Sequence, residues 1–102
     1  AAVRTALARD DAGRWRCRVV VYGDSPTWLV VSLDRTDGLS ASFSVDAVAT
    51  GGAAVIPAGT LSIEDGHGSL ATVVGLQPDR LDAIVVRDAA GRVRYTVHIP
   101  TT

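Results

Sequence analysis

The segment from Leu39 to Ala47 alternates apolar and polar side chains without a break. Apolar residues, among them Phe43 and Val45, occupy every odd position, and serine or aspartate occupies every even one. Side chains two residues apart share a face of a β-strand, whereas a helix would distribute the serines around its circumference. The segment therefore predicts a strand with one face in a core and the other in water.

Two further segments have the same period. Between residues 15 and 22, one parity consists of Trp15, Cys17, Val19 and Val21, and the other consists of Arg16, Arg18, Val20 and Tyr22. Near the C-terminus, Val93, Tyr95, Val97 and Ile99 alternate with Arg94, Thr96 and His98. We therefore expect Cys17 to lie in the core, and we expect Arg16 and Arg18 to lie on the solvent face of a strand.

Five other segments have less regular strand patterns. The nearly continuous apolar runs 28–33 and 81–86 are typical of strands that are buried on both faces. Shorter candidates are the segments 3–8, 60–63 and 69–74. Clusters of Gly, Pro and Asp separate these segments, and such clusters are typical of tight turns.

Together the segments predict an all-β fold, an antiparallel β-sandwich of about 7–8 strands with immunoglobulin-like architecture. The 102 residues are enough for one hydrophobic core, so we expect a single domain over residues 1–102. The predicted core consists of Trp15, Val19, Leu29, Val31, Phe43, Val45, Leu70, Val85, Tyr95 and Val97.

Residues 9–16 and 87–94 are identical at six of eight positions, and each copy leads into an alternating segment. A repeat array needs at least three units, so two copies do not predict one. The similarity instead predicts two hairpins that use the same turn, at opposite edges of the sandwich.

The charge balance narrows the classes of partner. The chain has 10 basic and 11 acidic residues and a net charge of −1, whereas binding to nucleic acid or to an anionic membrane requires a positive surface. We therefore expect no nucleic-acid partner. The longest apolar runs are far shorter than the roughly 20 residues that span a bilayer, so we expect any membrane anchor to lie outside this segment.

The chain offers few residues for catalysis or for metal binding. Cys17 with His67 or His98 is a candidate Cys-His pair, but the apolar parity of Cys17 predicts a buried, unreactive thiol. One cysteine and two distant histidines lack the ligand number and spacing of a structural zinc site. No Gly-x-Ser-x-Gly elbow accompanies the serines, and the segment 64–68 is typical of a tight hairpin. We expect no catalytic residue, no cofactor and no metal, and hence no enzyme.

Trp28 has two interpretations. If Leu29 and Leu33 face the core, Trp28 points the other way and forms with Tyr22 a surface for a partner or a ligand, such as a sugar or a peptide. Alternatively, Trp28 packs at the end of the sandwich or under the turn at Gly23–Pro26. We favour the packed position because indole rings are on average highly buried.

Four short motifs follow one another along the chain. They are G-R-W-R-C-R-V at residues 13–19, S-P-T-W-L-V-V-S-L at 25–33, G-H-G-S-L at 66–70 and D-A-A-G-R-V at 88–93. Together they resemble the C-terminal extracytoplasmic domain of membrane-anchored, zinc-finger-type anti-sigma factors from actinobacteria. The resemblance covers nearly the whole chain and consists of packing and turn residues.

The resemblance implies a sensor or scaffold domain on the extracytoplasmic side of the cell membrane, anchored by a helix that is not in this chain. In that family a cytoplasmic zinc segment, His-x-x-x-Cys-x-x-Cys, accompanies the region that holds a sigma factor inactive, and neither that segment nor the membrane helix occurs here. We therefore expect this chain to contact a protein partner or a regulatory protease, and a sigma factor only through the missing cytoplasmic segment. The alternative function is a carbohydrate-binding or adhesion module that uses Trp28 and Tyr22. Both functions leave the oligomeric state open.

Overall fold

The structure is a computed structural model that describes residues 3–9, 15–23, 26–35, 41–52 and 54–100. Its elements are the strands β1 (Arg4–Arg9), β2 (Trp15–Gly23), β3 (Thr27–Arg35), β4 (Ala41–Ala49), β5 (Val55–Ile63), β6 (His67–Val74), β7 (Leu81–Arg87) and β8 (Val93–His98), with short 3-10 turns η1 (Thr50–Gly52) and η2 (Pro78–Arg80). The described residues contain no α-helix.

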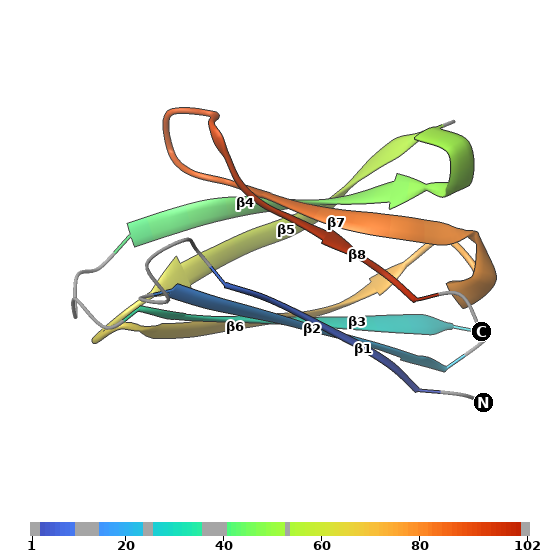
Figure 1. The fold of residues 1–102 in the computed structure, drawn as a ribbon, viewed down its shortest axis with the longest axis horizontal. Coiled ribbons are helices and arrows are strands. Elements are labelled where there is room, and N and C mark those ends of the chain that lie inside the picture. Colours follow the sequence, from blue (N-terminus) through green and yellow to red (C-terminus); the bar gives the residue numbers. More distant parts are fainter. Residues whose placement is uncertain (1–2, 10–14, 24–25, 36–40, 53, 101–102) are drawn as a thin grey trace.

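The eight strands form two antiparallel sheets that pack face to face, which confirms the predicted β-sandwich (Figure 1). One sheet has the strand order β1-β2-β3-β6 and the other has the order β5-β4-β7-β8. The chain changes sheet after β3, and then β6 returns beside β3 and β7 returns beside β4. These crossings between sheets are Greek-key connections, the kind that immunoglobulin-like sandwiches use.

The core lies between the two sheets and follows the period-two pattern of the sequence. In β4 the odd-numbered residues from Phe43 to Ala49 are buried, while Ser42 and Ser44 are exposed. The fully buried larger side chains come from both sheets and include Cys17, Val19, Val21, Leu29, Val31, Leu33, Val45, Leu61, Ile63, Leu81, Ile84 and Val86. Burial of each such aliphatic side chain contributes roughly 1.5–3 kcal/mol.

Two predicted core positions differ from this core, and a third is not described. Val85 is half-buried and faces outward, because β4 pairs its buried residues Val45 and Ala47 with Val86 and Ile84, which places Val85 on the opposite face. Leu70 is half-buried, although it packs against the core. The side chain of Trp15 lies outside the described part of the chain.

The expectation that the runs 28–33 and 81–86 are buried on both faces is wrong. In β3 the residues Leu29, Val31 and Leu33 are fully buried, but Trp28 is exposed and Val30 is half-buried. The reason is that this sandwich has two layers, so each sheet buries one face and leaves the other to solvent. A separate deviation occurs at the start of β8, where Val93 is exposed, although Tyr95 and Val97 of the same parity are buried.

The two lateral sides of the sandwich differ. On the closed side, where β5 and β6 lie, the two edge strands contact each other and are joined by the tight turn at Asp65-Gly66. Both turn residues have positive φ, 53° and 81°, as in the type I′ turn that Asp-Gly favours, so the predicted hairpin is confirmed. At Gly68 the strands approach so closely that an added Cβ would lie 2.1 Å from the carbonyl oxygen of Ser62.

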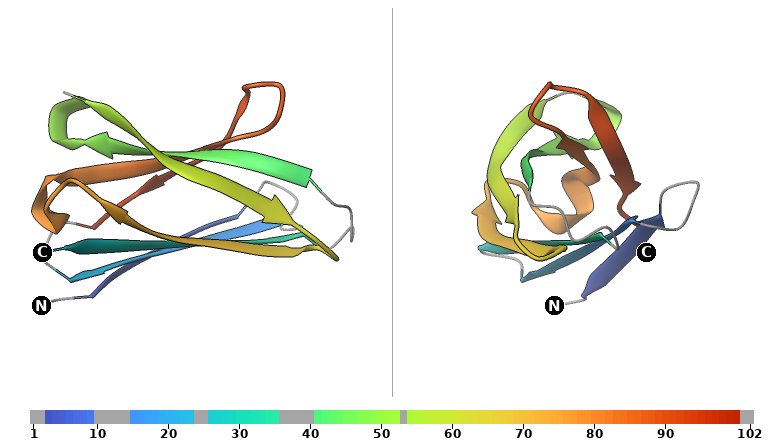
Figure 2. Two further views of the ribbon diagram at one scale, coloured as in Figure 1. Left: turned by 180° about the vertical axis from the view of Figure 1, so that it is seen from behind. Right: turned by 90° about the vertical axis from the view of Figure 1, so that its left-hand side faces the viewer.

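On the open side, β1 and β8 lie over one another as the edges of different sheets (Figure 2, right). The hairpins β1-β2 and β7-β8 therefore share one side of the sandwich, and the expectation that the two similar segments lie at opposite edges is wrong. The turn of the first hairpin falls outside the described residues. In the second, Asp88 accepts hydrogen bonds at Oδ1 from the backbone N–H groups of Ala90 and Arg92, both at 3.0 Å.

Candidate functional site

The outer face of the sheet that contains β1, β2, β3 and β6 carries two aromatic side chains side by side. Tyr22 of β2 is the register partner of Trp28 of β3, and Trp28 in turn is the register partner of Val73 of β6. We call the row Tyr22, Trp28 and Val73 the aromatic platform. Its three side chains are 38%, 37% and 48% exposed, so the row is accessible to solvent along its length.

The turn between β2 and β3 fixes the pairing of the two rings. Gly23 has a φ of 80°, and a Cβ at this position would lie 2.6 Å from the carbonyl oxygen of Pro26 and 3.7 Å from Cδ1 of Trp28. Glycine is thus required both by the backbone conformation and by the close approach. The turn pairs Gly23 with Thr27, and the next pair outward is Tyr22 with Trp28.

The two rings stack. Their centroids are 6.4 Å apart and their planes differ by 11°. Such a pair contributes roughly 0.5–1.5 kcal/mol beyond the area it buries, so each ring restrains the other in a fixed orientation. Trp28 therefore lies beside Gly23, on the outer face and exposed, as the surface interpretation expected. Part of the turn named in the favoured, packed interpretation lies outside the described residues.

Apolar side chains continue from the platform across the sheet. The next row consists of Val20, Val30 and Ala71, whereas Leu7 on β1 lies opposite Arg18 in a different row. Isolated apolar residues are common on protein surfaces, but a contiguous group of this kind is typical of an interaction site.

A shallow hollow of about 340 Å³ lies at the end of the platform. It is lined by Pro26, Thr27 and the segment 73–77, so Val73 belongs both to the platform and to the hollow. The hollow adjoins the platform at Val73, and its lining includes Gln77, whose side-chain amide can donate and accept hydrogen bonds.

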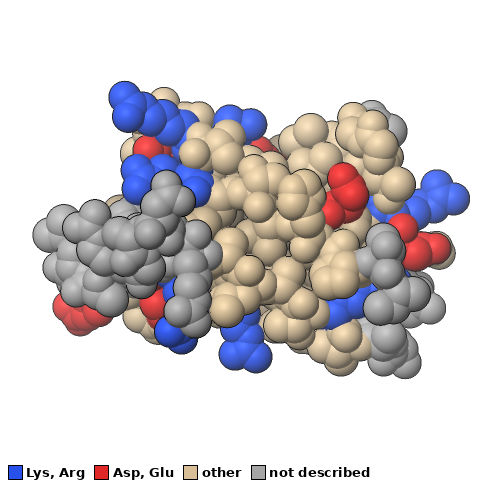
Figure 3. All heavy atoms as spheres, in the orientation of Figure 1, with Lys and Arg blue, Asp and Glu red and all other residues tan. Residues whose placement is uncertain are grey.

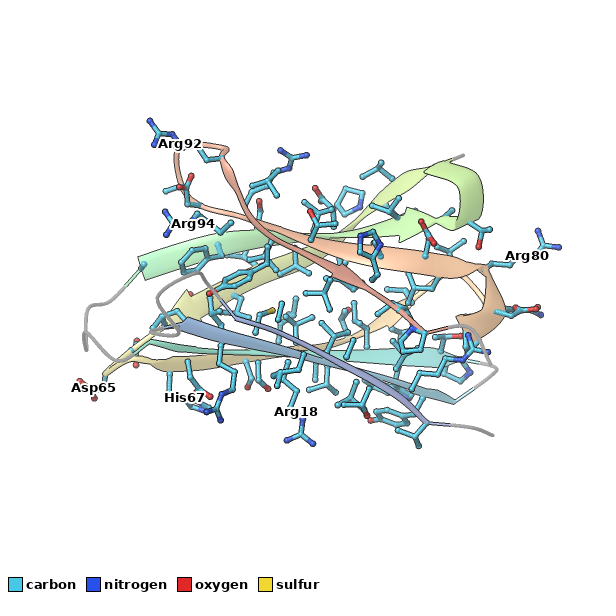
Figure 4. All side chains as sticks on the ribbon, viewed as in Figure 1. Arg18, Asp65, His67, Arg80, Arg92 and Arg94 are labelled. Carbon is cyan, nitrogen blue, oxygen red and sulfur yellow. The ribbon has the colours of Figure 1, made fainter. Side chains whose placement is uncertain are left out.

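The other end of the same outer face is polar. Arg16 pairs with Asp34 across β2 and β3, and Asp34 pairs with His67 across β3 and β6. Nδ1 of His67 is hydrogen-bonded to Oδ1 of Asp34, and the two side chains are 67% and 51% exposed. Figure 4 shows His67 and Arg18 projecting away from the second sheet. The contact between His67 and Asp34 is so exposed that it contributes at most about 1 kcal/mol.

The structure does not bring together the candidate Cys-His pair. Cys17 is fully buried, and burial raises the pKa of its thiol to about 12, so the nucleophilic thiolate is suppressed at neutral pH. His67 points outward from one sheet, and His98 is exposed on β8 of the other sheet. The interpretation of Cys17 as a packed core residue is confirmed. In the described ranges, no group of three or more His, Cys, Asp or Glu side chains is placed to hold a metal ion.

Comparison of the chain with models of known protein families, with curated proteins and with solved structures found no match in any of the three. Within the part of the chain that the structure describes, no helix has the length and apolar character of a membrane span.

Proposed function

We propose that this chain is a non-catalytic recognition domain, the extracytoplasmic sensor or scaffold domain of a transmembrane anti-sigma factor that regulates sigma-factor-dependent transcription. The resemblance supports this proposal, since the described parts of its motifs coincide with β2, with β3, with the start of β6 and with the β7-β8 hairpin. These elements build the fold, so the proposal concerns the type of domain and assigns no residue to sigma-factor binding.

The observation that carries the recognition function is the accessible aromatic platform. The core lies between the two sheets, so the stacked Tyr22 and Trp28 rings lie outside it, on the solvent side. Aromatic side chains with accessible apolar surface are enriched where proteins bind partners. In this proposal the platform contacts a protein partner, such as a regulatory protease, and a membrane helix outside this segment transmits the result to the cytoplasmic segment.

The proposal is tested in the full-length natural protein in its own cell, with a reporter gene transcribed by the adjacent sigma factor. The double variant Tyr22→Ser, Trp28→Ser is expected to change the inducing response of the reporter at unchanged protein level. The matched control is Val55→Ser, because Val55 is 60% exposed on β5, away from the platform. A normal response in the double variant, or a gene that encodes no membrane helix and lies beside no sigma-factor gene, would contradict the proposal.

A second function, carbohydrate binding or adhesion, is favoured by one specific observation. The two rings are nearly parallel, and Val73, the register partner of Trp28, also lines the hollow, an arrangement that offers a sugar ring both an apolar surface and polar groups at its rim. Trp28→Ala is then expected to abolish retention on immobilised glycans, whereas Val93→Ala on β8 leaves it unchanged. Glycan retention that survives Trp28→Ala would exclude this site.

A further inference from the structure

We infer that the free edge of β1 is a strand-addition site for an extended segment of a partner protein that carries an acidic group. The inference concerns a different surface from the aromatic platform and does not depend on the proposed function. A strand at the edge of a sheet has unpaired backbone N–H and C=O groups, and an extended peptide can pair with them. The question is which of the four edge strands, β1, β5, β6 and β8, is available.

The closed side of the sandwich is not available. The edges of β5 and β6 face each other, and Gly68 approaches the backbone of Ser62 so closely that a Cβ would overlap it. In addition, β5 contains Pro57, which has no N–H to donate, and its pairing with β4 shifts register between Val45 and Asp46.

The edge of β8 is also poorly suited to pairing. Its register with β7 shifts at Arg87, which pairs with Val93 after Val86 has paired with Tyr95. Its outward side chains are Arg94, Thr96 and His98, all exposed. Register irregularities and charged side chains are the features by which natural sheets discourage pairing at their edges.

The edge of β1 has neither proline, glycine nor a register shift. Its six residues pair with β2 in one uninterrupted register, from Arg4 with Val21 to Arg9 with Arg16. Leu7 is 51% exposed on this strand, and Val3, just before it, is 63% exposed. An added strand could therefore pair with β1 in a regular register, and its apolar side chains could pack beside those of Leu7 and Val3.

Arg4 indicates the chemistry of the partner. Its side chain has the same parity as Ala6 and Ala8, which pack against the core, and its Nη1 donates a hydrogen bond to the carbonyl oxygen of Pro78. Its Nε is buried, and within the described residues it has no hydrogen-bond partner. A buried donor of a charged group without an acceptor is rare and costly, and a carboxylate is the acceptor that a guanidinium binds best. We therefore assign to the partner an acidic side chain or a C-terminal carboxylate at the Arg4 end of β1.

The residues on the open side of the sandwich also indicate which kinds of side chain the partner segment carries. Every second residue of an added strand would lie on the same face as Ala6 and Ala8, whose small side chains pack against the core. Figure 3 views this side of the molecule and shows a mainly uncharged centre with charged side chains toward the periphery. The partner segment is thus extended, apolar at alternate positions and acidic at one end.

The test is selection of a displayed library of random segments, each about ten residues long, on the purified wild-type chain. The enriched segments are synthesised, and their affinity is measured for wild type, for Leu7→Lys and for the matched control Val93→Lys. Leu7 and Val93 have similar exposure, 51% and 48%, on the two edges of the open side, so a lysine is expected to be tolerated equally by the fold. Amide hydrogen exchange of β1, with and without peptide, locates the binding.

We expect enriched segments to alternate apolar residues and to contain an acidic residue, to protect β1 amides from exchange, and to bind Leu7→Lys about fivefold more weakly. Binding to Val93→Lys and to Trp28→Ala is expected to stay unchanged, and Arg4→Gln is expected to remove the preference for an acidic residue. The inference would be overturned if the segments bound Leu7→Lys as tightly as wild type. It would also be overturned if selection on wild type enriched no segments beyond those enriched by the same selection on Leu7→Lys. A wild-type dimer that Leu7→Lys converts to monomer would overturn it in favour of a second copy of this chain as the occupant of the edge.

Discussion

Replacement of Gly68 by alanine is expected to destabilise the domain more than any other single-methyl addition to a glycine outside the turns. Gly68 belongs to β6, and a Cβ at this position would lie 2.1 Å from the carbonyl oxygen and 2.9 Å from the carbonyl carbon of Ser62. It would also lie 3.0 Å from Cδ1 of Ile63. The first two atoms are backbone, so a side-chain rotation cannot relieve the overlap.

The expected loss of stability in Gly68→Ala depends on which parts of the structure must move to accommodate the methyl group. Relief of the overlap requires a shift of β5 relative to β6, and both strands contribute to the core through residues such as Leu61 and Val74. Overpacking of a dense core costs typically about 1–3 kcal/mol, and we expect Gly68→Ala to lie near the upper value because the neighbour is backbone. For a domain of this size each kcal/mol lowers the melting temperature by roughly 4–8 °C, so about 3 kcal/mol corresponds to a decrease of roughly 12–24 °C.

The assay is urea and thermal unfolding followed by tryptophan fluorescence and circular dichroism. Gly75→Ala is the matched control, because Gly75 has no left-handed φ and no atom within 4 Å of its added Cβ. We expect this control to change the free energy of unfolding by less than about 1 kcal/mol. Equal melting temperatures for the two variants would refute the close approach of β5 and β6, and with it the closed side of the sandwich.

Three further predictions concern the core and the outer face. Burial raises the pKa of Cys17 to about 12 from its ordinary 9.0, so the folded state holds the thiol proton more tightly than the unfolded chain. The stability that this difference provides is present below pH 9.0 and is lost as the pH rises toward 12. In urea unfolding, the free energy of unfolding is therefore expected to fall more steeply with pH above 9.0 for wild type than for Cys17→Ala. Leu29→Ala is expected to lower the free energy of unfolding by roughly 2–5 kcal/mol and Trp28→Ala by roughly 1–2 kcal/mol, because Leu29 faces the core and Trp28 faces solvent. Equal losses in chemical denaturation would contradict this assignment of the two faces of β3. Asp34→Asn is expected to change the free energy of unfolding by less than about 1 kcal/mol, since its partner His67 is exposed, and a larger loss in the same assay would mean that the pair is structural.

The strands with strict alternation were predictable from the sequence, and the continuous apolar runs were predictable only in part. In the segment 41–47 each residue differs in polarity from the next, so the sequence alone identifies the buried face. In the segment 81–86 both parities are apolar, and the selection of Ile84 and Val86 over Val85 depends on pairing with β4. A local pattern carries no information about which distant strand becomes the neighbour.

The first half of β5 was missed because it contains residues that normally end strands. Pro57 and Gly59 suggest a loop, but both are tolerated here on an edge strand beside a register shift. The parity of Tyr22 and Trp28 was predictable, and so was their shared face. Their direct stacking depends on the length of the turn at Gly23, and the Asp34-His67 pair depends on the pairing of β3 with β6, so neither was predictable from local sequence.

The measurement that tests the account most directly is an NMR experiment on the aromatic platform. It combines nuclear Overhauser contacts between the rings of Tyr22 and Trp28 with the broadening of side-chain signals by a soluble paramagnetic probe. We predict contacts between the two rings and strong broadening of both, with the methyl signals of Leu29 and Val31 unaffected. A Trp28 ring that is protected from the probe and in contact with core methyl groups would contradict the account, because the outer face would then present no aromatic surface for recognition.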